Sequence, residues 1–115
     1  MSLQTELLSR IYVAFNRREI ETVLSALHPD VDWPNGMEGG RVLGHDAVRA
    51  YWTRQFQILD PQVEPRSFTT ENDCVVVDVE QVVHDKSGKL LVSQMVQHVY
   101  QFHDGLVWRM DIRAV

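Results

Sequence analysis

The chain of 115 residues is long enough for one domain with its own hydrophobic core and too short for two. Its composition, 44% hydrophobic and 23% charged, is typical of a globular protein, and a net charge of −5 without a basic cluster argues against a nucleic-acid or anionic-membrane partner. A single cysteine, Cys74, excludes a disulfide framework, and the N-terminal segment lacks the pattern of a signal peptide or membrane span, so we expect one cytoplasmic domain over residues 1–115.

Two helices are predicted at the start of the chain. From Leu3 to Asn16 apolar residues recur at helical spacing, with Tyr12 at the edge of the apolar face. After a short polar break, a second apolar stripe from Ile20 to Leu27 predicts another helix, which His28-Pro29 stops.

A brief strand at residues 31–33 and a glycine-rich loop at residues 34–40 are predicted next. The loop lacks the Lys-Ser/Thr pair of a phosphate-binding loop, and it can act as a lid. A third helix begins near His45, with Asp46 in its first turn, and Pro61 ends it at about Asp60. Its inner face is a stripe at helical spacing: Val48, Trp52, Gln55, Phe56 and Leu59.

The second half of the chain is predicted to form strands. An extended connector over residues 61–66 leads to a modest strand at Ser67–Glu71, and a turn precedes a strand from Cys74 to Asp85. The turn at Ser87-Gly88 joins this strand to the next. If Lys86 pairs with Lys89, the opposed pairs are Val83–Val92, Gln81–Gln94, Val79–Val96 and Val77–His98.

The last hairpin joins a strand over residues 90–102 to a strand over residues 106–112. Even-numbered residues of both strands form one apolar face with His98 in its middle. A two-residue loop at Asp104-Gly105 would turn the apolar residues of the last strand to the other face. We therefore predict a three-residue loop, His103 to Gly105, which pairs Phe102 with Leu106 and His98 with Met110 and keeps Trp108 and Ile112 on the inner face.

The order of helix, helix, short strand, helix and antiparallel strands predicts an α+β fold, with helices packed on one side of a bent sheet. Three segments carry a resemblance to the nuclear transport factor 2-like superfamily: AFNRREIETVLSALHPDVDW, GHDAVRAYW and HVYQFHDGLVWRMDI. This superfamily includes ketosteroid isomerases, SnoaL-like polyketide cyclases and limonene-epoxide hydrolases. The resemblance implies a single SnoaL-like domain with a cone-shaped, curved antiparallel sheet, three N-terminal helices on its concave face (a cystatin-like α+β roll), and a homodimer.

The catalytic pattern of the ketosteroid isomerases does not carry over. That pattern uses an aspartate base after the first strand, a tyrosine of the first helix and a carboxylic acid of the sheet. The corresponding positions are Asn35, Ile11, which precedes Tyr12, and His98. Steroid-type isomerisation is therefore not expected, and neither is epoxide hydrolysis, because Arg109 and Asp111 fall on the outer face of the sheet.

His98 is the candidate catalytic residue. A neutral histidine on an apolar face can act as a general acid or base, or donate a hydrogen bond to a ligand carbonyl. The alternative is a core histidine bonded to Gln94, Tyr12 or a buried water. Gln81 and Gln94 pair and point inward, toward a ligand or only toward each other. The remaining candidate ligand-binding residues are Tyr12, Trp33, Asn35, Trp52, Phe56, Tyr100, Trp108 and Met110.

The expected ligand is a small, largely apolar organic molecule. If the protein is an enzyme, we expect cofactor-independent acid/base chemistry of the isomerase, cyclase or dehydratase type at His98; the alternative is a non-catalytic ligand-binding or dimerising accessory module. We expect no cofactor and no metal, because the histidines show no metal-ligand spacing. The outer face of the sheet mixes apolar with charged residues and predicts a homodimer interface that includes Val76, Val82, Leu91, Met95, Val99 and Val107.

Overall fold

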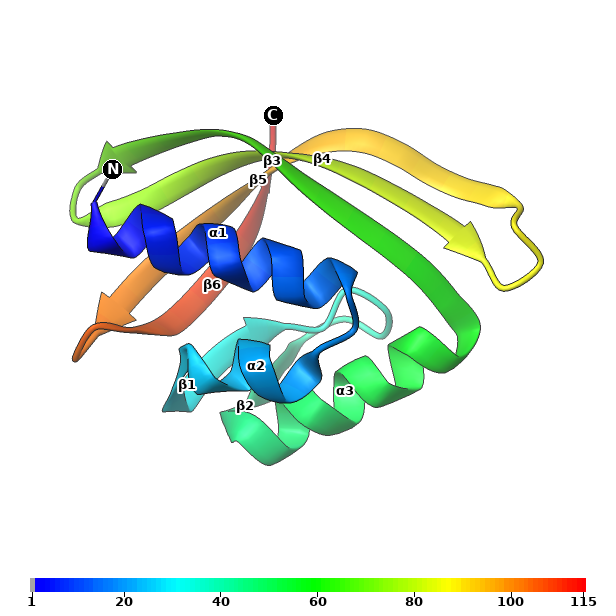
Figure 1. Ribbon diagram of the computed structural model, residues 1–115, viewed down its shortest axis with the longest axis horizontal. Coiled ribbons are helices and arrows are strands. Elements are labelled where there is room, and N and C mark those ends of the chain that lie inside the picture. Colours follow the sequence, from blue (N-terminus) through cyan, green and yellow to red (C-terminus); the bar gives the residue numbers. More distant parts are fainter. Residues whose placement is uncertain (1) are drawn as a thin grey trace.

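Six strands form one curved sheet, and the helices lie on its concave side (Figure 1). The computed structural model describes residues 2–115. In chain order the elements are α1 (Leu3–Asn16), α2 (Ile20–Ser25), β1 (Leu27–Pro34), β2 (Arg41–Leu43), α3 (Gly44–Ile58), β3 (Leu59–Glu71), β4 (Cys74–Asp85), β5 (Leu90–His103) and β6 (Leu106–Ala114). The strand order is β2-β1-β6-β5-β4-β3, and β1 and β6 are parallel whereas the other neighbours are antiparallel. The expected α+β class and curved sheet are confirmed.

Helix α1 has the predicted bounds and closes one side of the sheet. The side chain of Ser2 caps it by accepting the backbone N–H of Thr5 at 3.1 Å. At its other end the Asn16 amide donates to the carbonyl of Val63 at 2.7 Å and accepts the N–H of Val63 at 2.9 Å. This pair of hydrogen bonds ties the end of α1 to edge strand β3.

Helix α2 is shorter than predicted. It ends at Ser25, and Leu27 begins β1 instead of completing the helix. Leu27 is opposite Val107 in the parallel pairing of β1 with β6, and the N–H of Val107 donates to the carbonyl of Ala26 at 3.0 Å. Leu27 is buried in this strand as it would be in a helix, so burial alone could not separate the two.

The predicted connector at residues 61–66 is part of β3. This strand contains Pro61 and Pro65 and lies at the edge of the sheet, where a missing N–H costs no inter-strand hydrogen bond. The ladder with β4 shifts between Pro65 and Ser67, which leaves Arg66 without an opposed residue. The segment with two prolines is therefore an edge strand and not the connector that we predicted.

The hairpin of β4 and β5 has the predicted inner pairs. Val77 is opposite His98, and Gln81 is opposite Gln94; the pairs Val79–Val96 and Val83–Val92 also match. The predicted closing pair of Lys86 with Lys89 is wrong, because the N–H of Asp85 donates to the carbonyl of Lys89 and a bulge follows. Leu91, predicted on the outer face, is the extra residue of this bulge and lines the cavity described below.

The predicted three-residue loop between β5 and β6 is also wrong. The loop has two residues, Asp104 and Gly105, both with positive φ, and His103 is opposite Leu106. A bulge then places Trp108 in an extra position between the pairs Phe102–Val107 and Gln101–Arg109. Because of this extra residue, the side chain of Met110 points inward again. Tyr100 is opposite Met110, and His98 is opposite Ile112.

This bulge reverses two predicted orientations. Val107, predicted on the outer face, is fully buried in the core. Trp108, predicted inside, is 38% exposed. Val107 therefore does not belong to an interface on the outer face of the sheet, and Trp108 does not belong to the inner wall.

No helix among residues 2–115 is long and apolar enough to cross a membrane.

Candidate functional site

A cavity of about 510 Å³ lies between the concave face of the sheet and helices α1 and α3. The residues that line it come from α1, α2, α3, strand β1 and the loop after it, and strands β3 to β6. Eight of the predicted site residues line this cavity: Tyr12, Trp33, Trp52, Gln81, Gln94, His98, Tyr100 and Met110.

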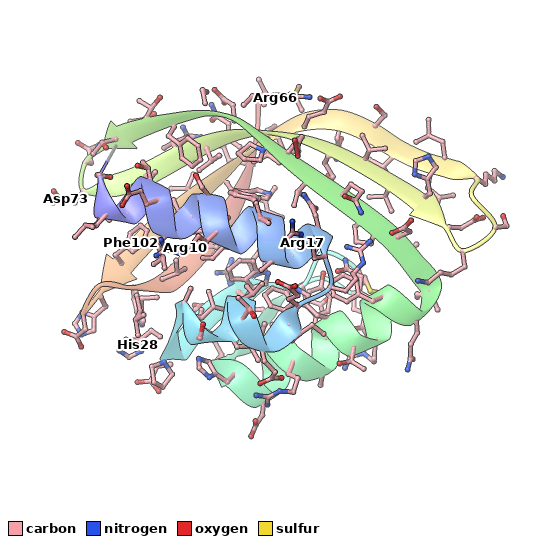
Figure 2. The ribbon with its side chains drawn as sticks, in the orientation of Figure 1. Arg10, Arg17, His28, Arg66, Asp73 and Phe102 are labelled. Atoms are coloured by element: carbon pink, nitrogen blue, oxygen red, sulfur yellow. The ribbon has the colours of Figure 1, made fainter. Side chains whose placement is uncertain are left out.

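The cavity wall carries no charged side chain. Among the described residues that line it there is no aspartate, glutamate, lysine or arginine. Charged side chains are instead found on the outside of the molecule, as Figure 2 shows for Arg10, Arg17, Arg66 and Asp73, which are all exposed. The polar groups on the wall are therefore uncharged amides, hydroxyls and one imidazole.

His98 is buried beside two tyrosines of the wall. The hydroxyl oxygen of Tyr12 lies 2.8 Å from Nδ1 of His98, and the Tyr100 hydroxyl donates to the Tyr12 hydroxyl at 2.7 Å. Tyr100 is also 3.5 Å from the same Nδ1. Strand β5 supplies His98 and Tyr100, two residues apart on its inner face, and α1 supplies Tyr12 from the opposite side.

Burial keeps all three groups uncharged at neutral pH. It lowers the pKa of His98 to about 4, because the imidazolium cation loses its hydration. It raises the pKa of Tyr12 well above the usual value for a phenol, and it also raises the pKa of Tyr100. The cluster is therefore a chain of neutral hydrogen-bonding groups.

The second ring nitrogen of His98 is left free for a ligand by the contacts of the first. Both hydrogen-bond contacts of the ring are made by Nδ1, and Nε2 has no partner among the described residues. Every fully buried side-chain polar atom of residues 2–115 has a hydrogen-bond partner, so Nε2 is not sealed inside the core. Because His98 lines the cavity, we infer that Nε2 is accessible from it.

Gln81 and Gln94 form an internal pair near the open side of the cavity. The Gln94 amide donates to Oε1 of Gln81 at 2.9 Å. The amide nitrogen of Gln81 and the carbonyl oxygen of Gln94 have no side-chain partner among the described residues. Because Gln94 is exposed, these two groups are accessible to water or to a ligand.

Trp33 and Trp52 form the aromatic part of the wall. Their rings meet edge to face with centroids 5.4 Å apart, and Phe15 contacts Trp52 in the same way at 5.6 Å. Both tryptophans are buried, yet both border the cavity. The three rings thus present flat apolar surfaces at fixed angles.

Three predicted site residues do not line the cavity. Asn35 folds into its own loop, where its Oδ1 accepts the N–H groups of Met37 and Glu38. Phe56 packs against Phe15, with Arg18 over its ring. Trp108 is turned outward by the β6 bulge.

Tyr51 is a wall residue that the sequence analysis missed. Its hydroxyl accepts the N–H of Gly36 at 3.0 Å and the side-chain amide of Gln55 at 3.3 Å. It thereby holds the glycine-rich loop, of which Gly36 and Met37 also line the cavity. Helical spacing could have revealed it, because Tyr51 is three residues after Val48 and four before Gln55.

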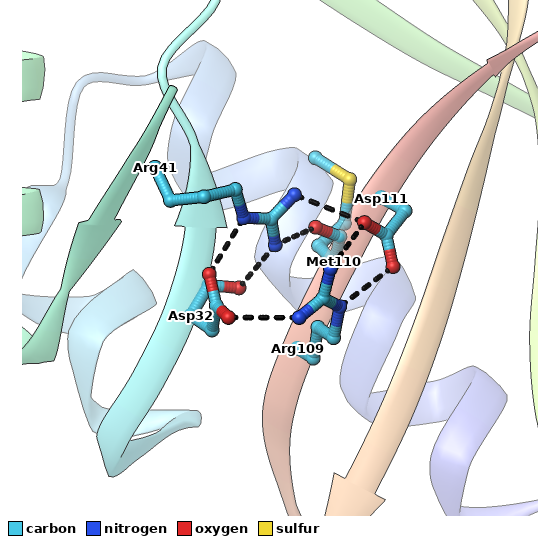
Figure 3. A network of polar contacts seen from close by, with 5 residues as sticks. All are labelled: Asp32, Arg41, Arg109, Met110 and Asp111. Atoms are coloured by element: carbon cyan, nitrogen blue, oxygen red, sulfur yellow. Dashed lines mark hydrogen bonds and ion pairs between the residues drawn. The ribbon is translucent and has the colours of Figure 1, made fainter.

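An Asp–Arg network lies outside the cavity, on the outer side of β1, β2 and β6 (Figure 3). Asp32 accepts from Nε of Arg41 at 2.6 Å and from Nη1 of Arg109 at 2.9 Å, and Asp111 also contacts both arginines. Arg41 donates in addition to the carbonyl of Met110 at 2.7 Å. The network therefore braces the point where β1 and β6 separate, and it does not face the candidate site, as the sequence predicted for Arg109 and Asp111.

Among residues 2–115 the fold brings together one group of possible metal ligands: His28, His103 and Asp104. Their ligand atoms lie within 4.8 Å of one another at the edge of the molecule, where Figure 2 labels His28. However, Nδ1 of His28 accepts the N–H of Asp30 at 3.0 Å. Nε2 therefore carries the hydrogen of the neutral ring, which opposes metal binding through that atom. We assign no metal to this group.

Comparison with known proteins gives a family and several similar structures. The family model of the SnoaL-like domain matches residues 8–110. No curated protein matches the sequence. An NTF2-like protein of unknown function from Burkholderia pseudomallei is 29% identical, with a TM-score of 0.87, over 100% of this chain and 92% of that one.

Two further solved structures are similar to this chain, at different levels of sequence identity. TerC, co-crystallised with polyporic acid, is 30% identical, with a TM-score of 0.85, over 99% of this chain and 92% of that one. An LEH-like epoxide hydrolase from M. tuberculosis is 16% identical, with a TM-score of 0.80, over 96% of this chain and 80% of that one. The similarity to the epoxide hydrolase is one of fold alone.

Proposed function

This chain belongs to the SnoaL-like domain family, and we propose that it binds a small, largely apolar organic molecule in the cavity on the concave side of its sheet. The observation that carries this proposal is a cavity of about 510 Å³ with one neutral imidazole at its buried part. Such a volume is typical of small-molecule sites, and so is an apolar wall with a few polar groups that orient the ligand.

The spacing of the polar groups suggests the size of the ligand. Gln94 and His98 are four residues apart on β5, which corresponds to roughly 13 Å along a strand. A molecule of two or three rings can extend from one to the other while its faces contact Trp33 and Trp52. The crystallisation of TerC with polyporic acid supports an organic ligand of this general kind.

A second candidate function is cofactor-independent acid/base catalysis, of the isomerase, cyclase or dehydratase type, at His98. It is favoured by an imidazole nitrogen that opens into the cavity. Against it, no carboxylate lines the cavity among the described residues, and a pKa of about 4 makes His98 a weak base at neutral pH. Ligand binding is therefore the primary proposal.

Titration with 2-acetylnaphthalene, a two-ring ketone, tests the binding site. We expect saturable heat of binding in calorimetry and a loss of at least ten-fold in affinity in Gln94→Phe, which fills the cavity. Gln57→Phe is the matched control, because it makes the same substitution at an exposed position of α3 that does not line the cavity. No binding to the native protein, or equal losses in both variants, would contradict the proposal.

The same ketone separates binding from catalysis. Its methyl protons exchange with D2O if the protein promotes enolisation, and proton NMR measures that exchange. Exchange faster than in buffer, and lost in His98→Phe, supports the catalytic candidate. Binding without accelerated exchange supports a binding module.

We also propose that a second copy of this chain packs against the outer face of β4 and β5. Met95 is 43% exposed there, beside the partly exposed Val82 and Val99. Acidic and basic side chains, Glu80 and Arg113 among them, border these residues and allow complementary contacts. Sedimentation should show a dimer that Met95→Asp dissociates, whereas Val13→Asp, on the exposed side of α1, leaves it intact; a monomeric native protein would exclude this interface.

A further inference from the structure

We propose that Tyr12 and Tyr100 are positioning residues that hold His98 in a single tautomer, with its hydrogen on Nε2. The cavity then presents an N–H donor, and the ligand must place an acceptor oxygen against it. The requirement for an acceptor oxygen on the ligand rests on the proposed ligand-binding function, whereas the tautomer itself does not.

The direction of the hydrogen-bond chain follows from Tyr100. Its side chain is buried, and its hydroxyl has two acceptors within reach among the described residues: the Tyr12 oxygen at 2.7 Å and Nδ1 of His98 at 3.5 Å. The shorter contact is the hydrogen bond, so Tyr100 donates to Tyr12. Tyr12 then donates to Nδ1 at 2.8 Å, which requires an unprotonated Nδ1 and a hydrogen on Nε2.

The opposite direction leaves a buried hydrogen unpaired. If Nδ1 donated to Tyr12 and Tyr12 donated to Tyr100, the Tyr100 hydrogen would have no acceptor among the described residues. An unmade hydrogen bond of a buried hydroxyl lowers the population of such a state on the order of ten-fold or more. In the favoured direction both hydroxyl hydrogens are satisfied, and only the Nε2 hydrogen remains for a ligand.

This polarity defines the chemical class of the ligand. A carbonyl, enolate or phenolate oxygen accepts from Nε2–H, whereas a group with only hydrogen-bond donors does not. An oxygen that carries negative charge forms the stronger bond, and no carboxylate on the described cavity wall repels it. The cavity is therefore suited to an aromatic carbonyl compound or a phenol bound through its oxygen.

Nitrogen-15 NMR of the ligand-free protein at pH 7 tests the tautomer. His98, assigned by the signals missing from His98→Phe, should show a pyrrole-type Nε2 and a pyridine-type Nδ1. In Tyr12→Phe/Tyr100→Phe the shifts should move toward a mixture of both tautomers. The double variant is needed because Tyr100 can turn to Nδ1 when Tyr12 alone is changed. Tyr51→Phe, at a tyrosine of the wall without a hydrogen bond to His98, should leave the shifts unchanged.

The inference is overturned if Nδ1 carries the hydrogen in the native protein or if the double variant keeps the native shifts. Its consequence for the ligand is tested with a matched pair of probes, 2-acetylnaphthalene and 2-isopropylnaphthalene. We expect the ketone to bind about ten-fold more tightly, as one neutral hydrogen bond provides, and the ratio to fall toward one in His98→Phe, which removes the donor. Equal affinities in the native protein contradict the donor role, whereas failure of both probes to bind contradicts the proposed function and leaves the tautomer to be decided by NMR.

Discussion

The hydroxyl oxygen of Tyr12 lies 2.8 Å from Nδ1 of His98, although 86 positions separate the two residues in the chain. α1 and β5 bring them together across the hollow of the sheet, and the described residues of the cavity wall include no charged side chain. Because burial keeps both groups neutral, their contact is a hydrogen bond rather than an ion pair.

Stability should fall as the pH is lowered from 6.5 toward 4. The pKa of His98 is about 4 in the folded protein and near 6.5 when the chain is unfolded, so the unfolded state binds the extra proton in this range. The stability associated with the neutral His98 is fully present above about pH 6.5, and the loss reaches at most about 3 kcal/mol by pH 4. Urea unfolding at pH 7, 6 and 5 measures it, with His98→Phe as the control.

The control should show a smaller slope between pH 6.5 and 5, because it lacks the buried imidazole whose pKa is lowered. Equal slopes for the two proteins would mean that His98 titrates normally. At pH 7 the variant should itself be less stable by about 1–3 kcal/mol, because the Tyr12 hydroxyl loses its acceptor.

Val107→Ala should destabilise the protein by about 2 kcal/mol, because Val107 is fully buried and the cavity left behind adds to the lost burial. Trp108→Phe should cost less than about 1 kcal/mol, since Trp108 is 38% exposed and the phenyl ring keeps most of its apolar contact. Chemical unfolding of the two variants provides the comparison. The reverse order would show that the bulge in β6 is not formed and that the three-residue loop is correct.

Asn16→Ala should cost about 1–2 kcal/mol by removing both hydrogen bonds that join α1 to Val63. Asn16→Asp keeps an acceptor for the N–H of Val63 but cannot donate to its carbonyl. It should therefore recover part of the loss at most. Thermal unfolding of both variants tests this order, and a fully stable alanine variant would show that the link does not hold α1 in place.

Arg41→Ala should destabilise the protein by about 1–2 kcal/mol, because Arg41 joins two carboxylates and the Met110 carbonyl at the point where β1 and β6 separate. Arg41→Lys should not restore this stability, since an ammonium group cannot make the planar, branched set of contacts. Arg54→Ala, which breaks an exposed ion pair with Glu38, is the control and should change little. Affinity for 2-acetylnaphthalene should be unaffected in all three.

Much of the inner face follows from the sequence alone. Alternation along β4 and β5, together with a short turn, was sufficient to pair Gln81 with Gln94 and Val77 with His98, because a strand that buries one face tolerates no slip of one residue. The SnoaL-like family and the α+β class could likewise be inferred from segments spread over the chain.

The predicted strand bounds and turns were wrong where the chain departs from regular alternation. A bulge in β6 satisfies both a two-residue turn and an inward Met110, which uninterrupted alternation cannot do, and it exchanges the environments of Val107 and Trp108. Pro61 and Pro65 appeared to exclude a strand, but an edge strand has one row of N–H groups that form no hydrogen bonds to a neighbouring strand.

The sequence by itself determined that His98 points inward from β5, since its side chain alternates with those of its neighbours. Only the tertiary structure decided what His98 contacts: the position of α1 across the sheet places Tyr12 at Nδ1 and leaves Nε2 to the cavity. Periodicity records which face of an element is buried, whereas contacts between distant elements depend on how those faces pack against one another.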